Sequence, residues 1–404
     1  MFYSLVKNVY FVKGAKNGCI YDFNCSKLYS VNQQLSEQMS FIAKGMMSCN
    51  KVEKTLQNTL DQLVELNVLS ITEYPVPTDI KEIGKQTFDC EFAWIEITRD
   101  CNLRCVHCYN EAENNTREIM PFDDYVFIIE ELVNLGVKKI QFIGGEPFYY
   151  SQLLKKMLEY AIGKFEFIEI FTNGTLIQDN WYEFLSQNKI HIALSMYSTY
   201  STEHDKVTGI VGSWEKAQIT LSKLRSYKIP CRVCSVLMKD IDIGEIHRYQ
   251  WGTKAKQDIV RLSGRADFSL LSEKLLKKKL ITKKSFQKPI NKYFCGFLVS
   301  GHNCFGRCIY ISANLTIYPC VMERRFSHGQ VCRNNSFHLK EEIMKLGKDH
   351  IDICCNCEYR YACFDCRPDA VSSDIYAKPW NCTYNPLSGI WEEEDDFIKK
   401  LGQL

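Results

Sequence analysis

Short apolar runs alternate with helical patterns through the middle of the chain. The helical stretches repeat apolar residues three and four positions apart and extend over about 10 to 15 residues. The apolar runs are residues 93–98, 139–143, 165–171, 190–196, 231–238 and 258–262. Nearly continuous apolar strands joined by helices are typical of a parallel sheet that is buried on both faces. We therefore predict an α/β domain of six β/α units over residues 87–270, with its site at the carboxyl ends of the strands.

The first part of the chain has a different pattern. Residues 9–31 read as two or three short strands, residues 34–67 as an amphipathic helical region, and residues 68–73 as a further strand. The stretch 75–86 begins with two prolines and continues with polar residues, which is typical of a linker because proline disfavours helix and lacks an N–H donor. We expect a separate N-terminal domain over residues 1–86.

The last third has little periodicity. Eleven cysteines lie between residues 295 and 382, so we expect bound metal to supply the stability that a small apolar core lacks. Seven lysines crowd residues 274–288, and like-charge blocks are usually exposed. We expect a basic linker over residues 271–290 and a cysteine-rich domain over residues 291–404.

Composition limits the possible partners and the compartment. The 404 residues include 50 Lys+Arg and 48 Asp+Glu, and this balance favours neither nucleic acid nor an anionic membrane surface. The twenty cysteines come without a signal peptide or a long apolar run, so we expect reduced, metal-binding thiols in a cytoplasmic protein with no membrane partner.

Three cysteines carry the strongest chemical signal. Cys101, Cys105 and Cys108 follow the first predicted strand of the α/β domain with the spacing C-x3-C-x2-C. Three thiolates can hold three irons of one [4Fe–4S] cube and leave the fourth iron open, whereas ferredoxin-type sets of four close every iron. An open iron suits chemistry on a small molecule. The alternative is a zinc site, but zinc loops favour paired C-x2-C units.

This loop, with Tyr109 and His107 beside the last cysteine, resembles the cluster loop of the radical S-adenosylmethionine (SAM) superfamily. The resemblance implies a partial (β/α)6 barrel in which the open iron binds the amino and carboxylate groups of SAM. The cofactor is then cleaved by one electron to a 5′-deoxyadenosyl radical. The resemblance also places His107 or Tyr109 near the adenine and Arg265, after the sixth strand, close by.

Two further strand ends fit the same resemblance. Gly144, Gly145 and Glu146, followed by proline, end the second strand, and in this family such a motif meets the ammonium of SAM with its backbone and its acidic side chain. An ordinary strand-to-helix turn is the alternative. The carboxylate and ribose of SAM would be met by residues at the ends of the third and fourth strands, namely Thr172, Asn173 and Ser195.

The C-terminal cysteines resemble the seven-cysteine pattern of SPASM domains, which bind two auxiliary [4Fe–4S] clusters. The resemblance implies that the outer cluster is held by Cys354, Cys357, Cys363 and Cys382. It implies that the inner cluster is held by Cys304, Cys320 and Cys366. Cys295 and Cys308 are both candidates for a fourth inner ligand, so the choice between a closed cluster and one with an open iron stays undecided. Leu315 stands where the pattern usually has glycine.

Two tail segments, residues 357–367 and 384–391, resemble the grasp-with-SPASM subgroup of peptide maturases. Strands followed by helices at the front of the chain also resemble a winged-helix-like peptide-recognition domain. These resemblances imply a ribosomally synthesised precursor peptide as substrate, an oxidative modification such as a thioether or carbon–carbon crosslink, and an ATP-grasp ligase as a partner. A flavodoxin or ferredoxin would supply electrons.

Two other functions fit parts of the pattern. A sulfatase-type, formylglycine-forming maturase shares the plan of three clusters, but the predicted N-terminal recognition domain argues against it. A non-catalytic iron–sulfur electron carrier would also need several clusters, yet it has no use for the open iron that three cysteines at C-x3-C-x2-C spacing leave.

Overall fold

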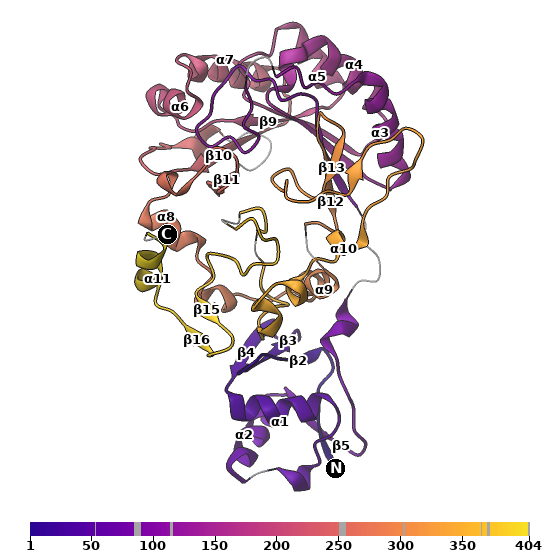
Figure 1. The fold of residues 1–404 in the computed structure, drawn as a ribbon, viewed down its shortest axis with the longest axis vertical. Coiled ribbons are helices and arrows are strands. Elements are labelled where there is room, and N and C mark those ends of the chain that lie inside the picture. The colour runs from indigo at the N-terminus through magenta and orange to yellow at the C-terminus, as the bar shows by residue number, and fades with distance from the viewer. Residues whose placement is uncertain are drawn as a thin grey trace.

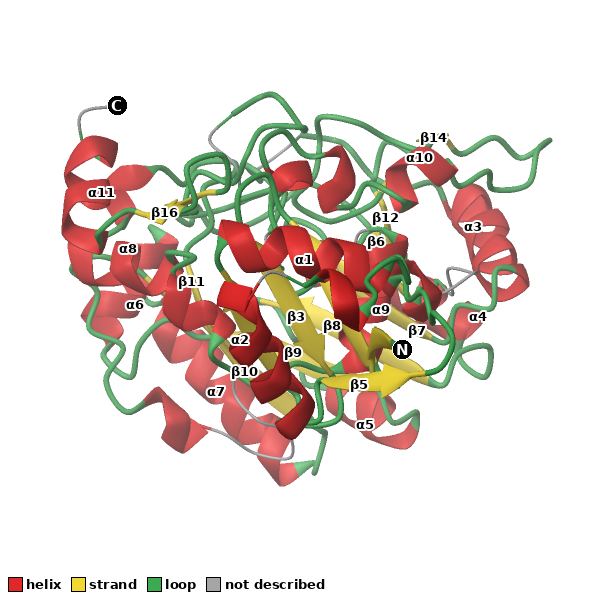
Figure 2. Cartoon of the chain, turned by 90° about the horizontal axis from the view of Figure 1, so that it is seen from below, coloured by secondary structure: helices red, strands yellow, loops and turns green. Residues whose placement is uncertain are grey.

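The computed structural model describes residues 1–52, 54–84, 90–113, 116–249, 256–301, 304–364, 366–369 and 372–402. The N-terminal module lies at one end of the molecule, the α/β domain at the other, and the C-terminal third between them (Figure 1). The view from below places α1 (Gln33–Ala43) and α2 (Lys54–Glu65) of the N-terminal module in front of the strands (Figure 2).

The α/β domain is built on parallel strands that pair in sequence order. They are β6 (Phe92–Glu96), β7 (Lys139–Ile143), β8 (Phe167–Thr172), β9 (His191–Ser195), β10 (Cys231–Leu237) and β11 (Lys256–Ile259). Each predicted strand is present. β7 has the predicted bounds, and β11 begins two residues earlier and ends three residues earlier than the predicted run 258–262. The predicted partial (β/α)6 arrangement is confirmed.

Helices cover the outer face of this sheet. They are α3 (Phe122–Asn134), α4 (Ser151–Ala161), α5 (Asn180–Gln187) and α7 (Ser213–Ser226). Helix α6 (Ser201–Thr208) instead packs beside residues 104–106. Side chains from strands and helices form one core, in which Ile95, Ile140, Ile170 and Ile192 are fully buried. Such burial of strand side chains explains the nearly continuous apolar runs in the sequence. Between β10 and β11, the described residues contain only a 3-10 turn (Ile246–Tyr249), so the last unit departs from the predicted helical repeat.

The C-terminal third extends the same sheet. β12 (Cys308–Ile311) pairs in parallel with β6, and β13 (Thr316–Tyr318) and β14 (Gly329–Gln330) continue antiparallel from it. Among the described residues this gives a nine-stranded sheet of order β11-β10-β9-β8-β7-β6-β12-β13-β14. The turn between β12 and β13 holds Leu315 at φ 67°, a left-handed conformation that explains why glycine is usual there.

The N-terminal module has two small sheets. β1 (Phe2–Leu5) pairs with β5 (Leu69–Thr72), and β2 (Val9–Lys13), β3 (Gly18–Asp22) and β4 (Lys27–Val31) form an antiparallel meander. The side chain of Asn32 caps α1 by accepting from Leu35 N. A separate core, which includes Tyr3, Met39, Ile42 and Leu60, holds the sheets and helices together.

The meander also packs against the C-terminal third. Tyr10, Val12 and Tyr21 share a buried cluster with Tyr359 and Tyr384. The Tyr21 hydroxyl donates to the carbonyl of Glu358 at 2.9 Å. The module is therefore not an independent appendage, because a face of its sheet is part of the core of the cysteine-rich region.

The basic segment differs from the prediction of an exposed linker. Helix α8 (Glu273–Lys279) buries Leu275, and Lys279 forms an ion pair with Asp369 in which the two side chains are 8% and 9% exposed. Lys279 Nζ also donates to the carbonyl of Val260 at 2.8 Å. The other lysines of the segment are more exposed, but Lys279 connects α8 to the sheet and to the C-terminal third.

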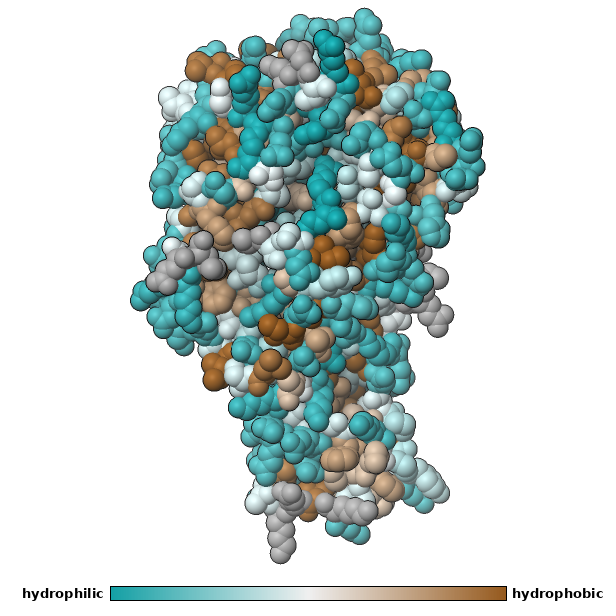
Figure 3. All heavy atoms as spheres, in the orientation of Figure 1, coloured by the Kyte–Doolittle hydropathy of each residue, from teal (hydrophilic) through white to brown (hydrophobic). Residues whose placement is uncertain are grey.

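The surface drawn in Figure 3 is mostly hydrophilic, and its apolar side chains form small separate groups. Within the described ranges, no helix is both long and apolar enough to cross a lipid bilayer.

Candidate functional site

The loop that follows β6 brings Cys101, Cys105 and Cys108 together. Cys101 is buried and packs in a small cluster against the other two cysteines. Burial raises the pKa of Cys105 to about 12, with the nearby Cys108 thiol adding to the shift and the Tyr197 hydroxyl opposing it. Burial also raises the pKa of Cys101, and the neighbouring Glu146, Cys105 and Cys108 add to the shift. Bound metal would offset this cost, because it binds the thiolate form.

Backbone hydrogen bonds hold this loop from several sides. Cys101 N donates to Glu113 O at 3.1 Å, and Arg104 N donates to Thr208 O at 2.9 Å. Arg265 N donates to Cys108 O at 3.1 Å, and its guanidinium donates to the carbonyls of Cys105 and Ala112. The structure thus brings Arg265 to the cluster loop, where it positions the backbone around the thiols.

Two glycines let β7 approach the loop closely. A Cβ on Gly144 would lie 2.3 Å from Thr98 O, and one on Gly145 would lie 2.2 Å from Asp100 O. Gly145 N donates to Thr98 O at 2.7 Å, and Glu146 N donates to Asp100 O at 2.8 Å. No side chain fits between these two backbones, so the glycines are required by this contact and not only by a turn.

Glu146 ties β7 to the end of β8. Its carboxylate accepts from Thr172 Oγ1 at 2.6 Å, from Asn173 N at 2.8 Å and from Phe148 N at 3.1 Å. Burial raises its pKa to about 7 in spite of these hydrogen bonds. The side chain has no exposed surface. Its predicted contact with the SAM ammonium stays a prediction, and what the structure shows is a positioning role.

Asn173 lies directly beside the first cysteine. Its Nδ2 is 3.9 Å from Cys101 Sγ and donates to Asn102 Oδ1 at 3.0 Å. Its Oδ1 accepts from Thr175 N at 2.9 Å. The end of β8 is therefore locked to the cluster loop by side-chain amides, and Asn102 joins the set that the sequence motifs had indicated.

His107 presents a buried polar atom to this region. Its ring packs edge-on against Tyr197, with centroids 4.8 Å apart. Burial, and to a lesser extent the charge of Arg265, lowers its pKa to about 4, so the ring is neutral at neutral pH. Its Nδ1 finds no hydrogen-bond partner among the described residues. Unsatisfied buried polar atoms are rare and often mark a missing ligand.

Ser195 lies at the carboxyl end of β9, close to Tyr197, and is nearly buried. Burial raises the pKa of Tyr197, with the neighbouring Cys105 thiol adding to the shift and the Ser195 hydroxyl opposing it. The candidate residues at the ends of β6, β7, β8 and β9 therefore surround one position. The thiols, the glycine backbone and the unpartnered His107 Nδ1 fit a SAM-binding [4Fe–4S] site.

Tyr109 is buried near charged groups of both the cluster loop and the C-terminal third. Its pKa is raised by burial and by the neighbouring Glu96 and Cys108, and the more distant Cys320 adds to the shift. Tyr109 therefore lies between the first cysteine loop and an inner auxiliary cysteine. The prediction that His107 or Tyr109 lies near the adenine stays a prediction.

Sequence reasoning missed the polar residues beside Tyr109. Glu96 accepts from Asn110 Nδ2 at 2.5 Å and from Ala313 N at 2.9 Å. Arg324 donates to the Tyr310 hydroxyl at 2.7 Å, and its guanidinium lies 4.2 Å from the centre of that ring. A charged residue inside the apolar run 93–98 was the available signal for Glu96. Arg324 has no comparable signal, because its neighbours come together only through the pairing of β12 with β6.

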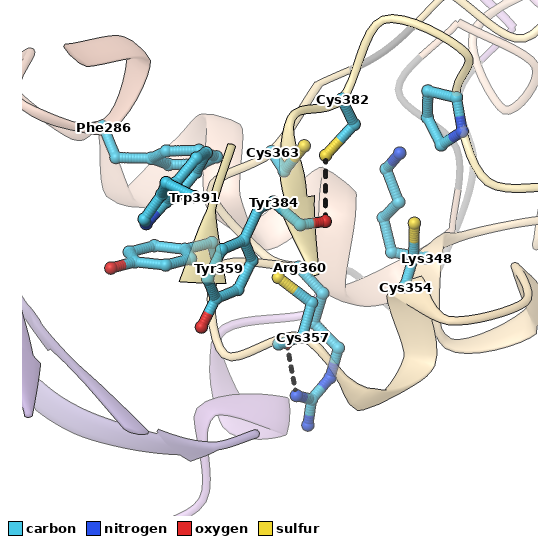
Figure 4. A pocket seen from close by; sticks show the side chains of 11 residues that line it. Phe286, Lys348, Cys354, Cys357, Tyr359, Arg360, Cys363, Cys382, Tyr384 and Trp391 are labelled. Carbon is cyan, nitrogen blue, oxygen red and sulfur yellow. Dashed lines mark hydrogen bonds between the residues drawn. The ribbon is translucent and has the colours of Figure 1, made fainter. Parts of the chain in front are cut away.

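Four of the C-terminal cysteines line one small cavity. They are Cys354, Cys357, Cys363 and Cys382, the set that the SPASM resemblance implies for the outer cluster (Figure 4). Lys348 and Arg360 also line the cavity, and Arg360 Nη1 donates to Cys357 O at 2.8 Å. Thiolate donors beside two cations fit an anionic iron–sulfur cluster.

Aromatic side chains form the other wall of this cavity. Tyr384 stacks on Trp391 with centroids 4.4 Å apart, and Phe286 lies 4.5 Å from Tyr359. Tyr384 and Trp391 belong to the hairpin of β15 (Tyr384–Asn385) and β16 (Ile390–Trp391). The two tail segments that resemble the grasp-with-SPASM subgroup therefore come together as the shell of the cavity.

Within the part of the chain that the structure describes, no three His, Cys, Asp or Glu side chains converge on a single metal ion. A cube spreads its thiolates over separate irons, so this finding bears on mononuclear sites alone. Cys231 packs in the main core, whereas Cys234 accepts from Arg232 Nη1 at 2.8 Å. These two cysteines therefore point to opposite faces of β10.

Comparisons with known proteins agree with this geometry. Residues 95–249 match the model of the Radical SAM superfamily. The chain is 32% identical over 158 residues to the antilisterial bacteriocin subtilosin biosynthesis protein AlbA of Bacillus subtilis (strain 168), a match that covers 38% of this chain and 35% of AlbA. It is 27% identical over 168 residues to the cysteine-type anaerobic sulfatase-maturating enzyme of Clostridium novyi (strain NT), covering 37% and 45% of the two chains.

One similar solved structure is that of Streptococcus suis SuiB bound to the precursor peptide SuiA. It has a TM-score of 0.51 and 12% identity, and the match covers 93% of this chain and 98% of SuiB. At this identity the likeness shows the fold alone. The matches span less than half the length of the two curated relatives. The chain contains a radical SAM domain, and the predicted fold class is confirmed.

Proposed function

We propose that this chain is a radical SAM enzyme that modifies a ribosomally synthesised precursor peptide. It would cleave SAM reductively and use the 5′-deoxyadenosyl radical to abstract hydrogen from a side chain of the peptide, and the product would be a thioether or carbon–carbon crosslink. The observation that carries the proposal is the composition of one site. The three cysteines of the C-x3-C-x2-C loop lie together there. The backbone of Gly144 and Gly145 packs against the start of this loop, and His107 Nδ1 is buried without a partner among the described residues.

The chain's own residues would bind and orient the cofactor. Cys101, Cys105 and Cys108 would hold the first [4Fe–4S] cluster, which supplies the electron for cleavage when SAM is bound. His107 Nδ1 would bond the adenine, and Ser195 would meet a polar group of the cofactor at the end of β9. Glu146 and Arg265 would keep the surrounding backbones fixed, because each is already committed to hydrogen bonds within the site.

A peptide substrate is supported by the N-terminal module. Its exposed elements include α1 and α2, and its meander reaches the wall of the C-terminal cavity. AlbA is a bacteriocin biosynthesis protein, and SuiB was solved with its precursor peptide. A sulfatase-type maturase stays the second candidate, because the enzyme from Clostridium novyi is also similar.

The remaining partners follow from the resemblance. A flavodoxin or ferredoxin would deliver electrons, and an ATP-grasp ligase would act on the same peptide. Two auxiliary clusters would lie between the barrel and the N-terminal module, one in the cavity lined by Cys354, Cys357, Cys363 and Cys382. Their task would be to pass electrons onward from the oxidised substrate.

Anaerobic incubation of the reconstituted full chain with dithionite and SAM tests the first step. We expect 5′-deoxyadenosine from the wild type and none from Cys105→Ala, with Cys25→Ala as a matched control because Cys25 is exposed and distant from the site. Absence of 5′-deoxyadenosine from cluster-loaded wild type would favour the electron-carrier function. Mass spectrometry of a precursor peptide encoded beside this chain, coexpressed with it, would then identify the modification.

A further inference from the structure

The inner auxiliary site has a geometry that selects among its candidate cysteines. Strand β12 pairs antiparallel with β13, with Tyr310 opposite Tyr318 and Ile311 opposite Ile317. Cys308 and Cys320 each lie two residues beyond the Tyr310–Tyr318 pair, at the open end of this hairpin, where Cys320 follows the last residue of β13. Cys304 and Cys320 also pack against one buried cluster that contains Phe305.

Alternation along β12 puts the Cys308 thiol on the inner face. Ile309, Ile311 and Ile317 are part of the main core beneath the helices. Because successive side chains of a strand point to opposite faces, Cys308 shares the other face of β12 with Tyr310. Tyr310 stacks on Tyr318 with ring centroids 5.9 Å apart, so these two side chains lie on the same face of the sheet.

A tight turn adds Cys304 to the pair. Cys308 N donates to Cys304 O at 3.0 Å, and Arg307 N donates to the same carbonyl at 2.9 Å. Arg307 is fixed in turn by an ion pair with Glu91 at 2.6 Å. Burial raises the pKa of Cys308, and the thiols of Cys304, Cys90 and Cys320 add to the shift, which agrees with their proximity.

Cys366 completes the group from the C-terminal side. Burial raises the pKa of Cys320 to about 12, with Cys366 and Cys304 contributing and the charge of Arg261 opposing. Arg261 also lies next to Cys366. Four thiols and one cation therefore share this region.

Cys295 lies elsewhere. It is 1% exposed in α9 (Lys292–Ser300), and its thiol is a neighbour of Cys19 and Tyr21 in β3. Burial raises its pKa to about 12, and none of the inner cysteines in the described residues contributes to that shift. Cys90 is close to Cys308 but packs in the main core, on the opposite face.

We propose that Cys308, and not Cys295, is the fourth cysteine ligand of the inner auxiliary cluster, with Cys304, Cys320 and Cys366. The inference rests on the proposed function only in taking this site to hold a [4Fe–4S] cluster. Four cysteines close every iron, so the inner cluster has no position for a substrate thiolate and is confined to electron transfer. Cys295 is a buried structural thiol at the junction with the N-terminal module.

The test uses the full chain without its first cluster. In a background where Cys101, Cys105 and Cys108 are all changed to alanine, the anaerobically reconstituted protein should hold the two auxiliary clusters. Adding Cys308→Ala should remove about half of the iron and sulfide, or replace one of the two reduced-cluster EPR signals. Adding Cys295→Ala or Cys90→Ala, the matched controls, should leave iron content and EPR signals unchanged.

A Cys308→Ser variant separates ligand loss from misfolding, because serine preserves the side-chain size and should alter the cluster signal while the circular dichroism spectrum stays native. Wild-type iron content and EPR signals in both Cys308 variants would overturn the proposal. Loss of a cluster in Cys295→Ala with the Cys308 variants unchanged would also overturn it. Neither outcome depends on SAM cleavage or on a peptide, so the proposed function would be judged separately.

Discussion

Close backbone contacts at single residues shape the candidate SAM site. Gly145 has no room for a methyl group, since the added carbon would lie 2.2 Å from a backbone oxygen that cannot move aside easily. Gly145→Ala should therefore destabilise the folded protein by more than about 2 kcal/mol. It should also weaken retention of the first cluster. Thermal unfolding and iron content of the reconstituted chain measure the two effects.

Gly402→Ala is the control for this substitution. A Cβ there would meet its nearest atom at 3.6 Å, which is ordinary van der Waals contact. An unfolding temperature for Gly145→Ala equal to that of Gly402→Ala would show that β7 does not pack on the cluster loop as described.

Because Glu146 is buried, the free energy of unfolding should depend on pH. Its folded pKa of about 7 lies above the ordinary value of 4.5, so the folded state favours the protonated acid. The stability that this group contributes is fully present below pH 4.5 and is lost as the pH rises to about 7, a loss on the order of 3 kcal/mol. Glu146→Gln cannot titrate, so unfolding free energies should shift in favour of the variant over this range.

Chemical denaturation of both proteins at several pH values measures that shift. Glu130→Gln serves as the control, because Glu130 lies at the surface beside Lys164 and its pKa is lowered. A constant difference between wild type and Glu146→Gln from pH 4.5 to 7 would contradict the described burial of the carboxylate.

Most of the SAM-site residues that sequence reasoning identified share one property, because they lie in short motifs at strand ends. The cysteine triplet, Gly144-Gly145 and Asn173 all follow apolar runs, and parallel topology then brings them together without further information. Arg324 could not be found in this way, because its partners lie in segments far apart in the sequence. The choice of Cys308 also needed the register of a hairpin.

At the scale of elements, the basic helix α8 is held by one buried ion pair. Lys279→Met would leave Asp369 buried without its cation, and breaking such a pair from one side costs about 3 to 5 kcal/mol. We expect a matching fall in the free energy of unfolding. Lys274→Met, on the exposed side of the same helix, should change it by less than about 0.5 kcal/mol. Equal effects of the two substitutions would show that Lys279 is solvated.

The strands of the barrel were predictable and the buried contact of α8 was not, for the same physical reason. Parallel strands that are buried on both faces are mostly apolar, which leaves a clear trace in the sequence. A block of like charges is exposed in most proteins. Lys279 departs from this rule because it pairs with Asp369 and donates to the Val260 carbonyl. Those partners lie outside the helix and its local pattern.

At the scale of the whole molecule, the N-terminal module depends on the C-terminal third. A fragment of residues 1–84 would expose Tyr10, Val12 and Ile80, which are 8%, 2% and 4% exposed in the chain. We expect the fragment to bind an apolar dye and to unfold at a lower temperature than the full chain. A Val12→Thr fragment should bind less dye. Cooperative unfolding without dye binding would show that the module is independent.

The pairing of β12 with β6 has a consequence for engineering this protein. A chimera that joins the radical SAM barrel of one protein to the cysteine-rich tail of another needs compatible strands as well as a compatible crossover point. The donor tail must supply a strand that pairs in parallel with the first barrel strand of its host. The pairing of β12 with β6 lies beside the cluster loop, which follows β6, and beside the β12–β13 hairpin. Exchanging residues 90–98 and 304–320 together would preserve the pairing of β12 with β6.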